Sequence, residues 1–402
     1  MKKFGLILLV FAFASCKNEA DPEADKSFFT KFYDNNAFNI GFTPLDVVQT
    51  SDGGFLVLGL RMATDTAGVD VDPGTIYLMK TDEFGEFLSD VSLDESLGLP
   101  APSLLNAGGK FFFFCMDVST FRIQLMEVSE DGTVAHQTEL TNVAGAYPLA
   151  AGVDGNSLLL LNYDPASRQT VMSVVSPDGG SSSKGFAIGA AGTSDTPEKS
   201  ILDHALRTGT QLPFFVGKAD AQYYFNGIYN YTLSTVFIDP NGDSPTNVVQ
   251  GNLDDGGLSA LYPIAGGKFA AARFNFGSNY LLPSVTLPTS SPSAADLGGN
   301  PYPELTPNAP VRIISATVNG SERILYGSNT RNKQIGLFGY NPVDGKLVGK
   351  KYIGFSNAFE IASIAETSDE GLVVLGTTYI AGRFPRICLF KLSPEALGKS
   401  FQ

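Results

Sequence analysis

Apolar and polar residues alternate in short runs along nearly the whole chain, and turn residues separate the runs. Residues 45–59 form one such unit, in which Ser-Asp-Gly-Gly at 51–54 stands between two apolar runs. Residues 361–376 repeat the unit near the other end of the chain. Asp-Gly and Gly-Gly between alternating runs indicate β-hairpins. A match between the two ends of a chain indicates further repeats between them.

Weaker copies of the unit fill the middle of the chain, each with two hairpin turns. The first turn recurs at 107–110, 154–156, 208–210, 265–268 and 319–321, and the second at 130–132, 177–180, 240–243 and 343–346. The units begin near Leu45, Pro102, Leu149, Leu202, Ser259, Val311 and Ile361, at a spacing of roughly 45 to 57 residues. Four strands at this period are typical of a propeller blade. No long amphipathic helical pattern interrupts the series. The sequence therefore predicts an all-β fold, a seven-bladed β-propeller of four-stranded antiparallel blades.

The two ends of the chain predict how the ring closes. The last unit has three strands before Gln402, whereas residues 28–32 precede the first unit without a partner. Tyr33 and residues 36–38 align with Tyr352 and residues 357–359, at the end of the outer strand of the sixth unit. We therefore expect the N-terminal strand to become the outer strand of the last blade. Such closure leaves no open strand edge.

The first residues predict an export signal and an anchor. Lys2 and Lys3 precede about ten mostly apolar residues, and Ala-Ser-Cys follows at 14–16. This stretch is shorter than the roughly 20 residues that a permanent transmembrane helix needs. It is typical of a bacterial lipoprotein signal peptide, so residues 1–15 are expected to be removed and Cys16 to carry the lipid. An ordinary secretory signal that happens to contain a cysteine is the alternative.

Residues 16–27 predict an acidic, flexible tether, which leaves 28–402 for the propeller. The segment 17–25 has four acids and no apolar anchor, so it stays solvated. It resembles the acidic export signal after the lipidated cysteine of surface-exposed lipoproteins of Bacteroidota. That resemblance implies an outer-membrane lipoprotein facing the cell exterior. A tether facing the periplasm is the alternative.

The net charge limits the classes of partner that the chain can bind, and the positions of the cysteines predict the state of their thiols. The chain has a net charge of −14, and loss of Lys2 and Lys3 makes it −16. A chain this acidic disfavours nucleic acid as a partner, because phosphate backbones need clustered Lys and Arg. Cys115 and Cys388 lie within apolar runs, which predicts two buried free thiols. A disulfide between them is the alternative, disfavoured because the two cysteines belong to non-adjacent units.

Three long stretches are candidate binding loops, because long connections in a compact scaffold often carry function. Residues 62–74 contain Asp65, Asp70 and Asp72, which either bind calcium or form a solvated acidic loop. Their irregular spacing favours the acidic loop, and no metal site is expected. Residues 288–310, rich in Ser and Pro, could lie on either face. Residues 218–231 hold aromatic residues that either form a recognition platform or pack between blades. These aromatic residues are Tyr223, Tyr224, Phe225, Tyr229 and Tyr231.

Signals for catalysis are few, and neither a catalytic residue nor a cofactor is expected. The chain has two histidines, and it lacks a nucleophile elbow, a phosphate loop and His-rich metal spacing. Asp46 and His204 are expected near inner strands, where side chains can face the central channel. A structural or solvated role is favoured for both.

The segments TSDGGFLVLG at 50–59 and IYLMKTDEFG at 76–85 resemble uncharacterised Bacteroidota lipoproteins with β-propeller repeats. This resemblance implies a surface or periplasmic binding module, often an accessory to an outer-membrane transporter or assembly complex. Two functions stay open. One is a non-catalytic lipoprotein that docks on an outer-membrane protein complex or captures a ligand. The other is an extracellular hydrolase or lyase with its active site in the channel. The first is favoured, because the inner strands at 45–48, 103–105, 149–151 and 361–364 are short of acids and bases.

Overall fold

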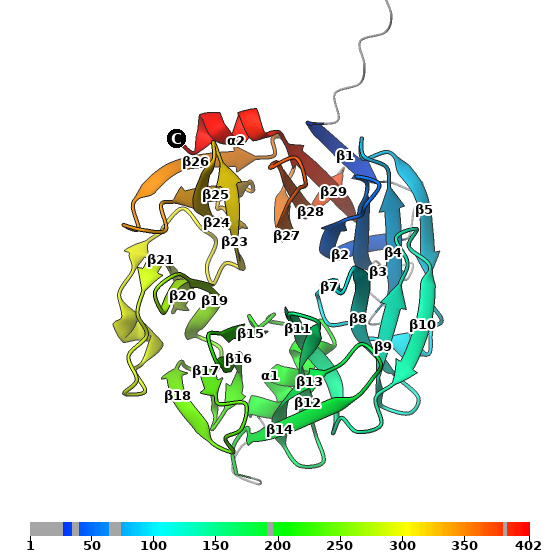
Figure 1. Cartoon of the computed structure of the whole chain (residues 1–402), viewed down its shortest axis with the longest axis vertical. Helices are drawn as coiled ribbons and strands as arrows, with labels where there is room; N and C mark the ends of the chain where they lie inside the picture. Colours follow the sequence, from blue (N-terminus) through cyan, green and yellow to red (C-terminus); the bar gives the residue numbers. More distant parts are fainter. Residues whose placement is uncertain (1–26, 34–39, 64–73, 191–195, 381–383) are drawn as a thin grey trace, which may run out of the picture.

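The computed structural model describes residues 27–33, 40–63, 74–190, 196–380 and 384–402. Within these residues, seven antiparallel sheets stand around a central axis as the blades of a propeller (Figure 1). The predicted fold is confirmed. Cys16 and the tether lie outside the described residues. Among the residues described, no helix is long and apolar enough to cross a membrane.

Each blade begins with the strand nearest the axis. Blade 1 comprises β2 (Ile40–Gln49), β3 (Phe55–Ala63), β4 (Thr75–Thr81) and β5 (Phe87–Ser92). Blade 2 comprises β6 (Leu97–Gly98), β7 (Leu105–Ala107), β8 (Lys110–Asp117), β9 (Arg122–Val128) and β10 (Val134–Glu139). Blade 3 comprises β11 (Ala146–Asp154), β12 (Ser157–Asp164), β13 (Gln169–Val175) and β14 (Ser181–Ala187). The helix α1 (Thr196–Ala205) then leads to blade 4.

The second half of the ring follows the same plan. Blade 4 comprises β15 (Phe215–Ala219), β16 (Gln222–Tyr229), β17 (Thr232–Ile238) and β18 (Pro245–Gln250). Blade 5 comprises β19 (Gly256–Ile264), β20 (Lys268–Asn275), β21 (Ser278–Val285), the 3-10 helix η1 (Ala294–Leu297) and β22 (Asn300–Pro301). Blade 6 comprises β23 (Val311–Val318), β24 (Ser321–Asn329), β25 (Ile335–Tyr340) and β26 (Leu347–Ile353). Blade 7 comprises β27 (Phe359–Glu366), β28 (Leu372–Ile380), β29 (Phe384–Leu392) and β1 (Phe29–Tyr33), and α2 (Pro394–Ser400) follows it along the chain.

The N-terminal strand closes the ring, as predicted. β1 pairs antiparallel with β29, from Phe29 opposite Lys391 to Tyr33 opposite Ile387 (Figure 1). Phe29 is buried and meets Phe55 of blade 1 edge to face, with ring centroids 5.8 Å apart. The Tyr33 hydroxyl donates to the Gly85 carbonyl, also in blade 1, at 2.8 Å. β1 therefore completes blade 7 and joins it to blade 1. The predicted alignment of residues 36–38 lies outside the described residues.

The predicted first turn of blade 4 is wrong. Residues 208–210 follow α1, where the Thr208 N–H donates to the Asp203 carbonyl at 2.8 Å and Gly209 has φ +84°. The first hairpin of the blade instead turns at Asp220 and Ala221, between β15 and β16. A left-handed glycine ends helices as readily as it turns hairpins, so Gly209 alone does not distinguish them. The helix itself buries Pro197, Ile201 and Ala205 at a spacing of four residues.

Blade 2 has a broken inner strand, which the predicted four-strand pattern does not include. β6 and β7 both pair with β8, and the chain between them contains Pro100 and Pro102. Proline has no N–H to donate to a strand ladder, so the inner strand is interrupted there. The N–H of Leu104 is thereby left to bond a side chain of blade 1, as described below.

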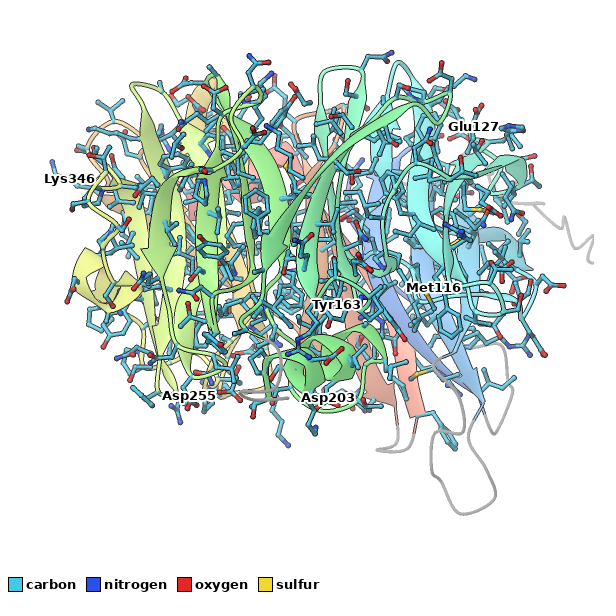
Figure 2. All side chains as sticks on the ribbon, turned by 90° about the horizontal axis from the view of Figure 1, so that it is seen from below. Met116, Glu127, Tyr163, Asp203, Asp255 and Lys346 are labelled. Carbon is cyan, nitrogen blue, oxygen red and sulfur yellow. The ribbon has the colours of Figure 1, made fainter. Side chains whose placement is uncertain are left out.

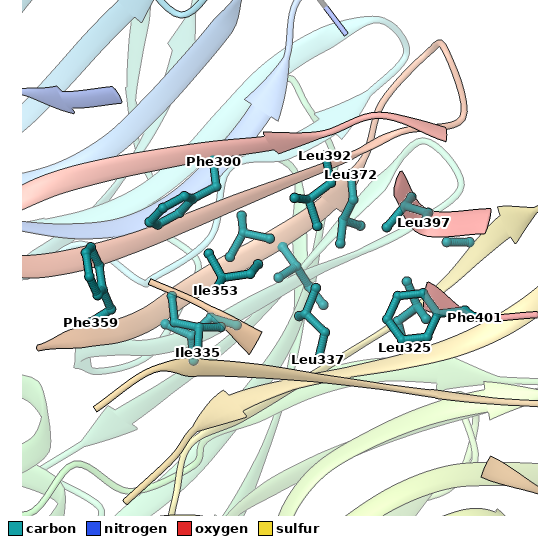
Figure 3. Close-up of a cluster of buried hydrophobic side chains, with 14 of the residues drawn as sticks. Leu325, Ile335, Leu337, Ile353, Phe359, Leu372, Phe390, Leu392, Leu397 and Phe401 are labelled. Atoms are coloured by element: carbon teal, nitrogen blue, oxygen red, sulfur yellow. The ribbon is translucent and has the colours of Figure 1, made fainter. Parts of the chain in front are cut away.

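Adjacent blades are held together by apolar cores. Figure 3 shows the core between blades 6 and 7, where Leu337 and Ile335 face Leu372 and Phe390. Leu397 of α2 and Phe401 after it close the same core at the outer end. Because both faces of each blade pack against a neighbour, the central strands of the blades are buried almost throughout. Cys115 and Cys388 are buried free thiols in separate cores, which confirms that prediction.

The repeated Thr-Ser-Asp turn holds a lysine from the third strand of its blade. In blade 1 the Lys80 Nζ lies 2.8 Å from Asp52 Oδ1 and 2.7 Å from Thr50 Oγ1. In blade 7 the Lys391 Nζ lies 2.8 Å from Asp369 Oδ2. Both lysines are buried. This shared ion pair explains why the sequence repeat is sharpest in the first and last blades.

The Asp52–Lys80 pair predicts a loss of stability in acid. Burial alone would raise the pKa of Asp52, but hydrogen bonds from Lys80, Thr50 and Gly54 outweigh it and lower the pKa to about 2. A lowered folded-state pKa stabilises the fold fully above the unfolded pKa of about 4, and this contribution is lost as the pH falls toward 2. We expect Asp52→Asn to flatten the fall of the urea midpoint between pH 4 and 2. The exposed Asp243→Asn change is the control and should leave that slope unchanged; equal slopes in both variants would contradict the assignment.

Candidate functional site

A cavity of about 800 Å³ lies at the axis, and residues from all seven blades line it. Its wall consists of the first residues of inner strands, the last residues of second strands and the connections between blades. We call the side on which these parts emerge the cavity face. α1 lies on this face, with Asp203 and Asp255 at its edge in Figure 2, and Glu127 lies toward the opposite face. The cavity is the candidate binding site.

β-bulges shape the inner wall. In blades 1, 3, 5 and 7 the pairing of the first two strands shifts by one residue at the level of the cavity. The shifts leave Leu45, Ser259 and Ala362 unpaired in blades 1, 5 and 7, whereas blade 3 has two shifts and leaves both Tyr147 and Leu149 unpaired. Bulges bend a strand and redirect side chains, and they are frequent beside functional sites. Among the unpaired residues that line the cavity, Ser259 brings a polar side chain to the wall.

Asp46 lines the cavity, as the sequence predicted, and ties three blades together. Its Oδ2 accepts from the Leu104 N–H of blade 2 at 2.7 Å. Its Oδ1 accepts from the Val47 N–H at 2.9 Å and from the hydroxyl of Ser363 in blade 7. Burial raises the pKa of Asp46, and these bonds and the charge of Arg312 oppose that rise. The carboxylate is thus engaged with the scaffold.

His204 also lines the cavity and lies near an inner strand as predicted, but on the helix α1, which contacts β11 of blade 3. Its Nδ1 accepts from the Leu212 N–H at 3.1 Å, and its ring also bonds the Leu149 backbone. The ring stands edge to face on Phe214 at 4.6 Å between centroids. Burial, with the nearby charge of Arg207, lowers the pKa of His204 to about 3. The imidazole is therefore neutral at physiological pH, and its hydrogen bonds support the wall.

Two arginines bring positive charge to the cavity, and the sequence reasoning missed both. Arg207 follows α1 and Arg312 lies on β23. The Arg312 Nε donates to the Ala362 carbonyl at 2.7 Å, and a terminal nitrogen of Arg207 lies 3.4 Å from the Pro100 carbonyl. The expectation that acids and bases are few therefore holds for the four inner strands named and not for the whole wall. It rested on four inner strands and left out β23, where Val311-Arg312 was the available signal.

Neither arginine forms an ion pair within the described residues, although the charge of Asp46 reaches Arg312. Within the described residues, no Asp or Glu oxygen lies within 4.0 Å of either guanidinium, and Arg207 Nε is buried without a hydrogen-bond partner. Burial, together with the charge of Arg312, lowers the pKa of Arg207 to about 10. Burial also lowers the pKa of Arg312, and the charge of Asp46 opposes this. The pKa of Arg207 still leaves it cationic at neutral pH, and Arg312 carries its charge as arginines in proteins do.

The aromatic residues of 218–231 lie mostly on a strand, and the predicted loop there is wrong. Tyr223, Tyr224, Phe225 and Tyr229 belong to β16, and only Tyr231 falls in the turn after it. Tyr224 is 5% exposed and Phe225 fully buried. Tyr229 packs against Phe186 of blade 3 at 6.3 Å between ring centroids. The misplaced turn at 208–210 displaced the first two predicted strands of the blade toward the N-terminus, so the residues of β16 were predicted to form a loop.

The partly exposed members of this set are also held by neighbours. The Tyr223 hydroxyl donates to Asp154 Oδ2 at 3.0 Å, and Lys218 Nζ lies 2.8 Å from the same oxygen. The Tyr231 hydroxyl accepts from the Ala190 N–H at 2.6 Å. The structure therefore places these residues as the packing alternative describes. None of the five lines the axial cavity.

The other candidate loops give no defined site. Asp65, Asp70 and Asp72 lie outside the described residues. In the described part of the chain, no three His, Cys, Asp or Glu residues gather closely enough to hold a metal ion. The stretch 288–310 divides between the two faces. Its first part joins β21 to β22 opposite the cavity face, and its last part joins β22 to β23 and reaches the cavity wall at 307–310.

Comparison with known proteins identifies no family. No protein-family model and no curated protein matches the chain. Among solved structures, the chain is similar to the Dos1 propeller at 7% identity and a TM-score of 0.47, covering 89% of this chain and 94% of that one. It is similar to a protein from Lactobacillus plantarum at 12% identity and 0.46, covering 84% and 96%. One of two prolyl endopeptidases matches at 11% identity and 0.43, covering 92% of this chain and 52% of that one. These likenesses are too distant to bear on function.

Proposed function

We propose that the protein is a non-catalytic binding module, anchored by lipid to the outer membrane and facing the cell exterior, whose axial cavity captures a ligand. The cavity with its two unpaired arginines carries this proposal. A concave site with a few converging polar groups is the usual form of a small-molecule site. The rim belongs to the face where the blade connections emerge, which leaves the opposite face for docking to an outer-membrane protein complex or transporter.

The hydrolase or lyase alternative finds less support in this cavity. Its candidate groups were Asp46 and His204. A general acid or base needs a pKa near the working pH and a hydrogen bond to spare for the substrate. His204 has a pKa of about 3, and Asp46 accepts from Val47, Leu104 and Ser363. Both side chains are hydrogen-bonded to the wall of the cavity. Ligand binding without catalysis therefore fits this cavity better than hydrolase or lyase activity does.

Replacement of the lipidated cysteine tests the anchor. We expect Cys16→Ala to move the protein from the membrane fraction to the soluble exported fraction, because attachment of the lipid begins at that thiol. Metabolic labelling with a fatty-acid analogue should disappear at the same time. Cys115→Ala is the matched control, since this thiol is buried in blade 2. If the Cys16→Ala protein stays labelled and membrane-bound, the lipoprotein assignment is wrong.

A further inference from the structure

The axial cavity holds two guanidinium groups that form no ion pair, although the charge of Asp46 acts on one of them, Arg312. Arg207 and Arg312 are half-buried and lack carboxylate partners among the described residues. A buried charge is costly unless it is paired. The charge of Arg312 acts on Arg207, so the two guanidinium groups also repel each other. A bound anion would remove both penalties.

We propose that Arg207 and Arg312 form the binding site for the carboxylate group of a small organic acid. This inference rests on the proposed function, since it names the ligand class of the same cavity. Guanidinium groups offer planar, paired donors that match a carboxylate. The ligand lies along the axis with its carboxylate between the two arginines.

The hydroxyl of Ser259 supplies a third contact. Ser259 is the unpaired residue of the β19 bulge and is 6% exposed. Its Oγ is buried and has no hydrogen-bond partner in the described part of the chain. Buried polar groups in folded proteins are nearly always hydrogen-bonded, so such a group calls for an explanation. In the occupied cavity, this hydroxyl bonds the carboxylate or a polar group beside it.

The backbone at Arg207 also favours a binding role. Arg207 has φ +56° at the end of α1, a conformation that glycine adopts without strain. A glycine here would remove both the strained backbone and an unpaired buried charge. Stability alone therefore gives no reason for an arginine at this position, whereas anion binding does.

The remaining wall selects a singly charged acid over phosphate. Asp254 and Glu360 line the cavity and are exposed, so they form an acidic rim around the cationic interior. A doubly charged phosphate would be repelled by this rim more strongly than a carboxylate. Leu45, Phe214 and Phe274 provide apolar surface for the body of the ligand. The volume of about 800 Å³ lies in the range that bound small molecules occupy.

Calorimetric titration of the purified full-length mature lipoprotein in detergent tests the inference. The probes are benzoate, galacturonate and an N-acetylated tripeptide with uncharged side chains, their neutral counterparts benzamide, galactose and the same acetylated tripeptide amidated at its C-terminus, and inorganic phosphate. We expect at least one carboxylate to bind at least tenfold more tightly than its neutral counterpart. The three carboxylates distinguish a free aromatic acid, an acidic sugar and a peptide as the source.

Arginine variants then assign the site. Arg207→Gly and Arg312→Gln should each weaken carboxylate binding at least tenfold, while Arg207→Gly keeps the melting temperature of the wild type. Arg122→Gln, an exposed change on β9 away from the cavity, should bind as the wild type does. Unchanged binding in both cavity variants overturns the inference, and so does a preference for phosphate.

A cavity-filling variant separates this inference from the proposed function. Thr210 is exposed and lines the cavity, so Thr210→Trp fills it without disturbing a core. If neutral and charged counterparts bind equally and both are lost only in Thr210→Trp, the carboxylate inference fails and the binding function stands. If no probe binds and native mass spectrometry finds no compound on protein taken from its own membranes, both fail.

Discussion

A chain that lacks residues 27–33 is expected to unfold at a much lower temperature than the full chain and to aggregate. β1 is the outer strand of blade 7, and its removal exposes the ladder of β29 over residues 387–391. An unpaired strand edge invites pairing with other chains. The loss also removes Phe29 and Tyr33, which join blade 7 to blade 1. Calorimetry with light scattering measures both effects.

Single substitutions show how much of this effect comes from packing. Phe29 is 7% exposed, and Phe29→Ala should lower the free energy of unfolding by about 3–5 kcal/mol. The adjacent Phe28 is 57% exposed, and Phe28→Ala should change it by less than about 0.5 kcal/mol. An unfolding midpoint that stays the same after deletion of 27–33 would contradict closure through the N-terminus.

The propeller could be predicted from the sequence because its signals are local. Hairpin turns such as 51–54 and 177–180 need particular residues at particular places, and these recur with the blade period. The prediction failed where the same residue type is common in two kinds of local structure. Gly209 lies in the turn that follows α1 and has the same left-handed conformation that turns a hairpin, and this error displaced the first two predicted strands of blade 4. The break in blade 2 was missed because Pro102 was taken as the start of the unit, whereas β6 precedes it.

The site could be predicted only in part, because it is built from contacts between distant residues. Asp46 was placed correctly at the channel by its position in an inner strand. Its role depends on Leu104 and Ser363, which the closed ring brings to it from two other blades. Arg207 and Arg312 are separated by about a hundred residues, and what marks them is that neither forms an ion pair within the described residues. A local sequence pattern cannot show that a side chain lacks an ion-pair partner in the folded protein.

Tyr224→Ser is expected to lower the free energy of unfolding by about 3–5 kcal/mol, as for other large aromatic truncations in a core. Tyr224 packs against Phe237 at 5.7 Å and Phe269 at 6.4 Å between ring centroids, so its ring joins blades 4 and 5. Urea denaturation of the purified protein gives the value. Tyr224→Phe keeps the ring and is the matched control, with an expected loss below about 1.5 kcal/mol.

The same experiment decides between the two interpretations of the aromatic segment. Tyr223 is half-buried and its hydroxyl is bonded to Asp154, so Tyr223→Ser should cost less than Tyr224→Ser. A recognition platform would show the reverse pattern, with binding lost and stability kept, because exposed aromatic residues contribute to binding and little to folding. If Tyr224→Ser leaves the urea midpoint unchanged while ligand capture disappears, β16 belongs to the binding surface. The binding surface then extends beyond the axial cavity.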